Sequence, residues 1–282
     1  MKKEKYIFLF MTIMVLTISC YMYTEKHGSV GTSGAEIGIS AGQAILIDGN
    51  TGKVLYEKSA DEKAYPASTT KIMTALITIE TLEKYGSPIN QIVEIPAEAQ
   101  GVEGSSLYLK AGEKISVEDL LYGLMLVSGN DAAVALAEII GGSEKEFVKM
   151  MNDRAKELHC ANTHFVNPNG LFDENHYTSV RDMAIIAKTA MENREFREIV
   201  STKVRRADRE ESTYITFNNK NKTVYDYKGG SGVKIGYTKD SGRTLVASAD
   251  RGKKRMICVV MSAPDWFNDA YRLMDYGFDI SN

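Results

Sequence analysis

A serine and a lysine stand three residues apart in "YPASTTKIMTAL", where Ser68 and Lys71 fall between a proline and an apolar helical pattern. At positions i and i+3 of a helix, two side chains share one face with Cβ atoms about 5–6 Å apart, so the lysine nitrogen can reach the hydroxyl. A serine becomes a nucleophile when a base takes its proton, and a lysine serves as that base when burial or nearby positive charge lowers its pKa. The alternative is a helix-capping serine beside a solvated lysine, the commoner meaning of this spacing alone.

Two further polar groups interrupt apolar patterns downstream. In "LMLVSGNDAAVAL", Ser128 and Asn130 separate two apolar helical segments, and polar groups there are costly unless they are bonded or used. They either cap the helix that begins at Asp131 or act as a proton shuttle and a hydrogen-bonding clamp. Farther on, Lys234 precedes Gly236 in a strand-like run, where a glycine indicates a bulge or the close approach of another backbone. The alternative for this pair is an exposed strand lysine beside a bulge.

The order of the predicted elements indicates an α+β fold. Residues 43–58 form two extended runs around a turn rich in Asp, Gly and Asn, which is typical of a hairpin. A helical repeat begins at Ser68 and closes at Gly86, and the helices after it cover residues 116–128, 131–142, 143–159 and 178–193. Strand patterns then occupy residues 213–219, 231–238, 243–250 and 255–263, and a last helix runs from Trp266 to Tyr276 and ends at Gly277. We expect helices on both faces of an antiparallel sheet.

The composition limits the classes of function. The chain has 282 residues, of which 44% are hydrophobic, and its formal net charge of −3 argues against a nucleic-acid-binding protein. The three cysteines, Cys20, Cys160 and Cys258, are too few for a disulfide scaffold. A single Cys160–Cys258 bridge fits the count, but apolar surroundings favour two buried thiols.

The N-terminal 42 residues differ from the rest of the chain. A basic start, "MKKEK", precedes an apolar run over residues 6–19, which predicts export to the extracytoplasmic face of a bacterial cell membrane or the cell wall. Residues 1–23 suit a cleaved signal peptide, a lipoprotein signal that ends at Cys20, or an uncleaved membrane anchor. Residues 24–42 are rich in Gly and Ser and indicate a flexible linker, so that the folded domain spans residues 43–282.

The three polar features together resemble the serine penicillin-recognising enzymes, whose motifs S-x-x-K, S-x-N and K-x-G occur in this order. The flanking text, including "AYPASTTKIMTAL", "LLYGLMLVSGNDAAVALAE" and "NTHFVNPNGL", is similar to that of the D-alanyl-D-alanine carboxypeptidases, the low-molecular-mass penicillin-binding proteins. The similarity runs from about Gln43 to Phe278. It implies the β-lactamase/transpeptidase-like fold, with a helical subdomain beside the sheet.

The resemblance also implies roles for individual residues. Ser68 is the acylated nucleophile, Lys71 its general base and Ser128 a proton relay. The backbone N–H groups of Ser68 and Tyr237 form the oxyanion hole. The residues implied in substrate binding are Asn130, Lys234, Gly236, Tyr237 and Thr238.

The implied substrate is a peptidoglycan stem peptide that ends in D-Ala-D-Ala, from which the terminal D-Ala is removed through an acyl-enzyme. β-Lactam antibiotics are implied as covalent inhibitors, and no metal, cofactor or nucleic acid is expected. The rival functions are a D,D-endopeptidase, a serine β-lactamase, for which no activating glutamate can be assigned, and a weakly active binder of cell-wall peptide.

The sequence departs from the family at two places. Ile235 replaces the threonine of the usual K-T-G motif, so we expect active chemistry with weakened or altered substrate binding, and Thr238 or Arg243 are candidates for compensation. The chain also ends four residues after Phe278. The expectation is therefore a catalytic domain without a C-terminal β-rich domain, attached to a membrane only through its N-terminus.

Overall fold

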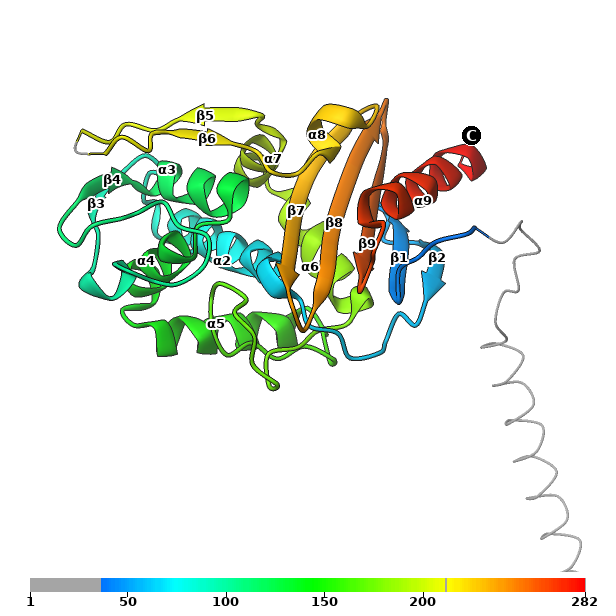
Figure 1. Cartoon of the computed structure of the whole chain (residues 1–282), viewed down its shortest axis with the longest axis horizontal. Helices are drawn as coiled ribbons and strands as arrows, with labels where there is room; N and C mark the ends of the chain where they lie inside the picture. Colours follow the sequence, from blue (N-terminus) through cyan, green and yellow to red (C-terminus); the bar gives the residue numbers. More distant parts are fainter. Residues whose placement is uncertain (1–36, 211, 282) are drawn as a thin grey trace, which may run out of the picture. The chain divides into compact units, whose positions relative to one another are not determined.

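The computed structural model describes residues 37–210 and 212–281 (Figure 1). The predicted export segment and most of the predicted linker lie outside these residues. The compact unit that begins at Gly38 contains every element below. Ahead of the first strand, the Ser40 hydroxyl donates a hydrogen bond to Asp269 at 2.7 Å, and Ala41 is fully buried. The packed structure therefore starts a few residues before Gln43.

Five antiparallel strands form the main sheet, in the order β2-β1-β9-β8-β7. The predicted hairpin of residues 43–58 is confirmed, because β1 pairs with β2 in an antiparallel register. Figure 1 shows β7 at the edge of the sheet that faces the helical part of the molecule. The strands are β1 (Gln43–Asp48), β2 (Val54–Lys58), β7 (Gly230–Thr238), β8 (Gly242–Arg251) and β9 (Lys254–Met261).

Helices and two small hairpins make up the rest. The helices are α2 (Lys71–Tyr85), α3 (Val117–Tyr122), α4 (Asn130–Gly141), α5 (Glu144–Glu157), α6 (Val180–Glu192), α7 (Arg194–Ser201), α8 (Thr223–Asp226) and α9 (Trp266–Ile280). Shorter helical turns are η1 (Ala67–Thr70), η2 (Ala97–Ala99) and a π-helical turn, η3 (Gly123–Val127). Strand β3 (Ile92–Glu94) pairs with β4 (Lys114–Ser116), and β5 (Val204–Arg206) pairs with β6 (Thr216–Asn218).

The sheet is covered on both faces, as the α+β prediction requires. Alternate strand residues point to opposite faces, and Ile45 and Val259 join the large core that also contains residues of α2 and α6. Leu46 and Met256 point the other way and meet α9. Figure 1 shows α6 and α9 on opposite sides of the strands. The fold class predicted from the sequence is confirmed.

The last helix does not end at Gly277, as the sequence predicted, but continues to Ile280. Gly277 lies where α9 packs on the sheet. A Cβ there would stand 2.7 Å from Leu46 Cδ2, so close packing and not helix termination requires the glycine.

Cys160 and Cys258 are both free and buried, which confirms the preference for two thiols. Within the described residues, no helix is both long and apolar enough to cross a membrane.

A buried ion pair fastens the β5–β6 hairpin to the segment before β4. Arg209 binds both oxygens of Glu113, at 2.6 and 3.0 Å, and the two side chains are 0% and 6% exposed. The guanidinium also donates to the carbonyl oxygens of Leu107 and Tyr214. The Arg209 guanidinium thus donates to a carboxylate and two carbonyl oxygens. Removal of the Glu113 carboxylate would leave a buried cation without its counter-charge.

We expect Glu113→Gln to lower the free energy of unfolding by about 3–5 kcal/mol, the usual cost of breaking one side of a buried pair. Chemical denaturation measures this change. Asp153→Asn is the matched control, because it removes a carboxylate whose partners, Lys149 and Lys156, lie on an exposed helix surface; its denaturation midpoint should not move. Equal effects of the two substitutions would show that the Arg209 pair does not stabilise the fold.

Candidate active site

Ser68 lies in the 3-10 turn η1, and the α-helix α2 begins three residues later at Lys71. The alternative in which Ser68 is a helix cap does not hold, because Pro66 and Thr70 take the N-cap positions of η1 and α2. Thr69 Oγ1 donates to the Pro66 carbonyl oxygen at 2.7 Å. The residue before Ser68, Ala67, has a φ of 48°, a left-handed conformation that is rare for alanine. The Ser68 hydroxyl is therefore left available at a strained turn.

Lys71 is fully buried, and three groups surround its Nζ atom. Nζ lies 3.0 Å from Ser68 Oγ, 2.7 Å from Asn130 Oδ1 and 2.5 Å from the Asn169 carbonyl oxygen. The two carbonyl-type oxygens can only accept hydrogen bonds, so they take two N–H groups of the lysine. In the neutral amine, the remaining lone pair then faces the serine hydroxyl. The structure thus brings together Ser68, Lys71 and Asn130, which the sequence had placed in two separate motifs.

Burial and like charge favour the neutral form of Lys71. Its pKa is held well below the usual range for lysine, first by burial and then by the positive charges of Lys234 and Lys220, while Asp131 opposes the shift. Lys234 is also buried, and burial together with Lys220 lowers its pKa to about 7. Lys220 belongs to no recognised motif, so the sequence did not predict its place near the site. Its Nζ donates to the carbonyl oxygen of Val127, the residue before Ser128, at 2.9 Å.

The "SGN" segment occupies the turn between η3 and α4. Ser128 has a φ of 69° and is buried, and among the described residues no hydrogen-bond partner of its hydroxyl is found. Gly129 takes the N-cap position of α4, so neither Ser128 nor Asn130 caps that helix. Asn130 bridges two elements, because its Oδ1 accepts from Lys71 and its Nδ2 donates to the Glu103 carbonyl oxygen at 2.7 Å. The amide therefore fixes the position of the lysine.

Asp131 holds the strand-like segment that borders this turn. Its carboxylate accepts backbone N–H groups from Leu107 and Leu109 and the hydroxyl of Ser106, at 2.6–3.2 Å. A buried carboxylate with several such donors is well compensated. This contact keeps the segment around Ser106 next to the start of α4.

The loop between α5 and α6 also borders the site, through the Asn169 carbonyl oxygen that contacts Lys71. Thr74 Oγ1 donates to the Pro168 carbonyl oxygen at 2.6 Å, and His176 Nε2 lies 2.8 Å from Thr70 Oγ1. The Val166 N–H donates to His176 Nδ1, so the ring proton must be on Nε2, and burial lowers the pKa of His176 to about 4. This histidine is therefore a neutral structural group that links the loop to η1.

The edge strand β7 borders the active site beside η1. An added Cβ at Gly236 would stand 2.5 Å from Thr244 Oγ1 and 2.8 Å from the Ser68 nitrogen, so a glycine is needed for η1 to approach the strand. Tyr237 follows it and is 66% exposed. The Thr238 hydroxyl does not join the groups around Ser68, because it is hydrogen-bonded to Ser241 Oγ at 2.7 Å within the β7–β8 turn.

The comparisons with known proteins agree with this geometry. The family model described as D-alanyl-D-alanine carboxypeptidase matches residues 30–265. The chain is 40% identical over 255 residues to D-alanyl-D-alanine carboxypeptidase DacF of Bacillus subtilis (strain 168), which covers 90% of this chain and 65% of that protein. It is 35% identical to the D-alanyl-D-alanine carboxypeptidase of Streptomyces sp. (strain K15), over 85% of this chain and 88% of that protein.

Solved structures give the same result. Penicillin binding protein 6B from Escherichia coli superposes with a TM-score of 0.81 at 32% identity, over 89% of this chain and 81% of that one. The Streptomyces K15 DD-transpeptidase superposes with a TM-score of 0.78 at 34% identity, over 86% of this chain and 98% of that one. The chain spans about three-fifths of the length of several relatives, for example 59% of DacD of Escherichia coli (strain K12). On these matches and on the assembled motifs, the chain belongs to the D-alanyl-D-alanine carboxypeptidase family.

Proposed function

We propose that this protein is a serine-type D-Ala-D-Ala carboxypeptidase that removes the terminal D-Ala from peptidoglycan stem peptides. The observation that carries the proposal is the contact of 3.0 Å between Ser68 Oγ and the nitrogen of a fully buried lysine whose other two partners are both acceptors. Such a lysine is a base directed at a single hydroxyl. Family membership supplies the substrate class, since the relatives are named for this activity.

The proposed reaction uses these contacts and the roles implied by the family. Lys71 takes the Ser68 proton while Oγ bonds to the carbonyl carbon of the penultimate D-Ala, and the N–H groups of Ser68 and Tyr237 bind the oxyanion that forms. The C–N bond then breaks, and the proton passes from Lys71 through Ser128 to the leaving amine. An ester on Ser68 remains. Water attacks this ester, gives a proton to Lys71, and the lysine returns it to Ser68 as the peptide acid leaves.

The proposed roles in substrate binding use the same arrangement. Asn130 keeps one Nδ2 proton for the substrate peptide after its contacts with Lys71 and Glu103. Lys234 places positive charge behind the scissile unit, and Gly236 lets the substrate backbone and η1 lie close to the edge of β7. Thr238 then acts through the shape of the turn, because its hydroxyl is already bonded.

The β-lactamase alternative has less support. In the class A enzymes, a glutamate activates the water that releases the acyl group. Within the part of the chain that the structure describes, no carboxylate contacts Lys71 Nζ, whose partners are a hydroxyl, an amide oxygen and a backbone carbonyl oxygen. A β-lactam that acylates Ser68 would therefore be released slowly, which makes it an inhibitor and not a substrate.

We infer from the proposed peptidoglycan substrate that the domain acts outside the cytoplasm, in line with the export pattern of residues 1–23.

Ser68→Ala should abolish both covalent labelling by a fluorescent penicillin and release of D-Ala from a D-Ala-D-Ala peptide, because no other hydroxyl contacts Lys71 Nζ in the described chain. Gel fluorescence and an amino-acid assay measure the two effects. Ser201→Ala, at an exposed position in α7, is the control and should behave as wild type. Serine-independent D-Ala release would refute the proposed nucleophile, and a purely binding protein would release no D-Ala even as wild type.

The rate of acylation by penicillin should fall as the pH drops through the pKa of Lys71, because the protonated lysine cannot accept a proton. Lys234→Gln removes a positive charge that lowers this pKa. The pKa should therefore rise, and the acidic limb of the pH profile should move to higher pH. Lys149→Gln, in an exposed part of α5, should leave the limb in place. An acidic limb that does not move in Lys234→Gln would mean that Lys71 is not the group that titrates.

Ile235→Thr should raise kcat/KM for a D-Ala-D-Ala peptide, mainly through a lower KM, because the new hydroxyl can donate to the substrate carboxylate. A hydrogen bond to a charged acceptor contributes about 1.5–3 kcal/mol, so a gain of about 10- to 100-fold is expected. Ile235→Val is the matched control, since valine has the shape of threonine without its hydroxyl. Steady-state kinetics of the three proteins separate the effects of shape and hydroxyl; no difference between the Thr and Val variants would exclude this role.

A further inference from the structure

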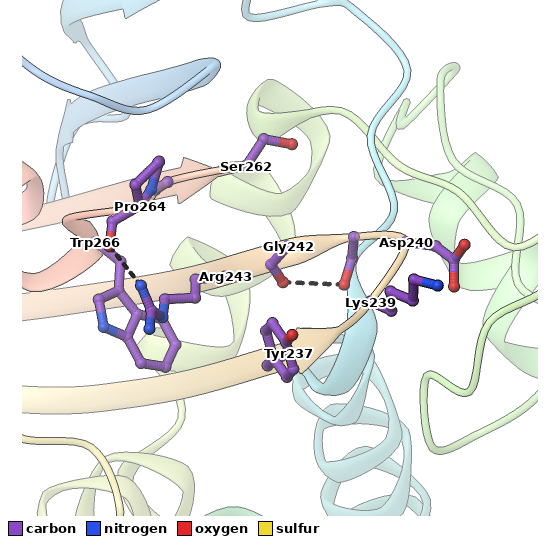
Figure 2. Close-up of a pocket in the computed structure, with 10 residues that line it drawn as sticks. Tyr237, Lys239, Asp240, Gly242, Arg243, Ser262, Pro264 and Trp266 are labelled. Carbon is purple, nitrogen blue, oxygen red and sulfur yellow. Dashed lines mark hydrogen bonds between the residues drawn. The ribbon is translucent and has the colours of Figure 1, made fainter.

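Two aromatic rings meet on the protein surface near Asn130. Tyr108 is 71% exposed, and its ring meets the ring of the half-buried Tyr214 edge to face, with centroids 5.8 Å apart and an interplanar angle of 85°. The exposed tyrosine that the proposed reaction uses, Tyr237, lies instead on β7, beside the β7–β8 turn (Figure 2). The reaction assigns no role to Tyr108 and Tyr214, the tyrosine pair.

The segment that carries Tyr108 is joined directly to the active site. The Asn130 N–H donates to the Ser105 carbonyl oxygen at 2.7 Å, and Asn130 Oδ1 accepts from Lys71. One residue therefore contacts both the proposed base and this segment. Three residues of extended chain span at most about 11 Å, so Tyr108 lies within about that distance of Ser105. The tyrosine pair is thus continuous with the substrate cleft.

The outward position of Tyr108 is enforced by buried contacts. Its φ of 58° is a left-handed conformation that a bulky residue adopts only under strain. Leu107 and Leu109 on either side are buried, and the Asp131 carboxylate binds both of their N–H groups. The Tyr108 N–H donates to Ser106 Oγ at 2.8 Å. Strain that is held by so many contacts favours a functional role for the exposed ring.

Arg209 fixes the second ring beside the first. Its Nη1 donates to the carbonyl oxygens of Leu107 and Tyr214, at 2.8 and 2.9 Å. The Tyr214 ring also packs on the buried ring of Phe217, with centroids 5.8 Å apart. In the part of the chain that the structure describes, neither hydroxyl of the tyrosine pair has a hydrogen-bond partner. Two rings and two free hydroxyls are therefore assembled before any ligand arrives.

This combination suits a sugar ring. A pyranose presents C–H groups on its faces, which pack on aromatic rings, and hydroxyl groups around its edge, which bond to phenol oxygens. In peptidoglycan, the sugar lies at a fixed covalent distance from the scissile bond, because the glycan strand carries the stem peptide. Four residues of extended peptide span about 14 Å at most. That length is comparable with the separation between Asn130 and Tyr108 along the segment described above.

We propose that Tyr108 and Tyr214 form a subsite for a sugar ring of the glycan strand that carries the stem peptide. This inference rests on the proposed carboxypeptidase function and deepens it, because it makes a stem peptide attached to sugar a better substrate than the free peptide. The cleft at Asn130 then holds the peptide, and the tyrosine pair holds the sugar. Arg209 and Asp131 act as positioning residues for the two rings.

The test measures D-Ala release from a free stem peptide ending in D-Ala-D-Ala and from the same peptide attached to its disaccharide. The full chain should show a higher kcat/KM for the sugar-linked peptide. Tyr108→Gly should reduce this preference by about 2- to 10-fold, the factor that the contacts of one aromatic ring represent, mainly through KM. Glycine is chosen because it adopts a φ of 58° without strain. Tyr108→Phe should keep most of the preference, since it keeps the ring.

Tyr85→Ala is the matched control. Tyr85 is 72% exposed and lies at the end of α2, about 21 Å along the helix from Lys71. This variant should keep the wild-type preference. Equal kcat/KM of wild type for the two substrates, an unchanged preference in Tyr108→Gly, or equal losses on both substrates would overturn the sugar subsite. Failure of wild type to release D-Ala from either substrate would instead refute the proposed function.

Discussion

The burial of a lysine amine is the constraint on which this site depends. Removing an ammonium ion from water costs several kcal/mol in a protein interior unless partners surround it or it loses its proton. The chain does both at Lys71: burial and two lysines favour the neutral form, and the partners of Nζ come from three separate segments, η1, α4 and the loop at Asn169. The helical part and the sheet must therefore be assembled before the base exists.

Close backbone contact is the second requirement. Gly236 and Gly170 approach the Ala67–Ser68 peptide, and a Cβ on either would come within 3.0 Å of the Ser68 nitrogen. Gly170 also has a φ of 86°, which other residues adopt only under strain. The unusual φ of Ala67 is thus held between the β7 edge and the loop. Larger side chains at either glycine would push η1 away and move Ser68 relative to Lys71.

The sequence predicted what depends on local patterns and missed what depends on contacts between distant segments. The antiparallel sheet with helices on both faces and the β1–β2 hairpin follow from periodicity and turn residues, and both were confirmed. The capping alternatives failed at the site: Pro66 and Thr70, not Ser68, take the N-cap positions of η1 and α2, and Gly129 takes that of α4. Lys220 and the Asn169 carbonyl oxygen carried no signal, since a lone lysine and a backbone oxygen gain meaning only from the atoms beside them. The roles of the site residues stay predictions.

The surroundings of Lys71 also explain why one amine can serve both halves of the proposed reaction. A base that accepts the Ser68 proton must later return it, so a pKa far from the working pH in either direction would slow one of the two steps. Lys234 and Lys220 lower the pKa of Lys71, and Asp131 raises it, so the balance is set by charges that do not touch the substrate bond.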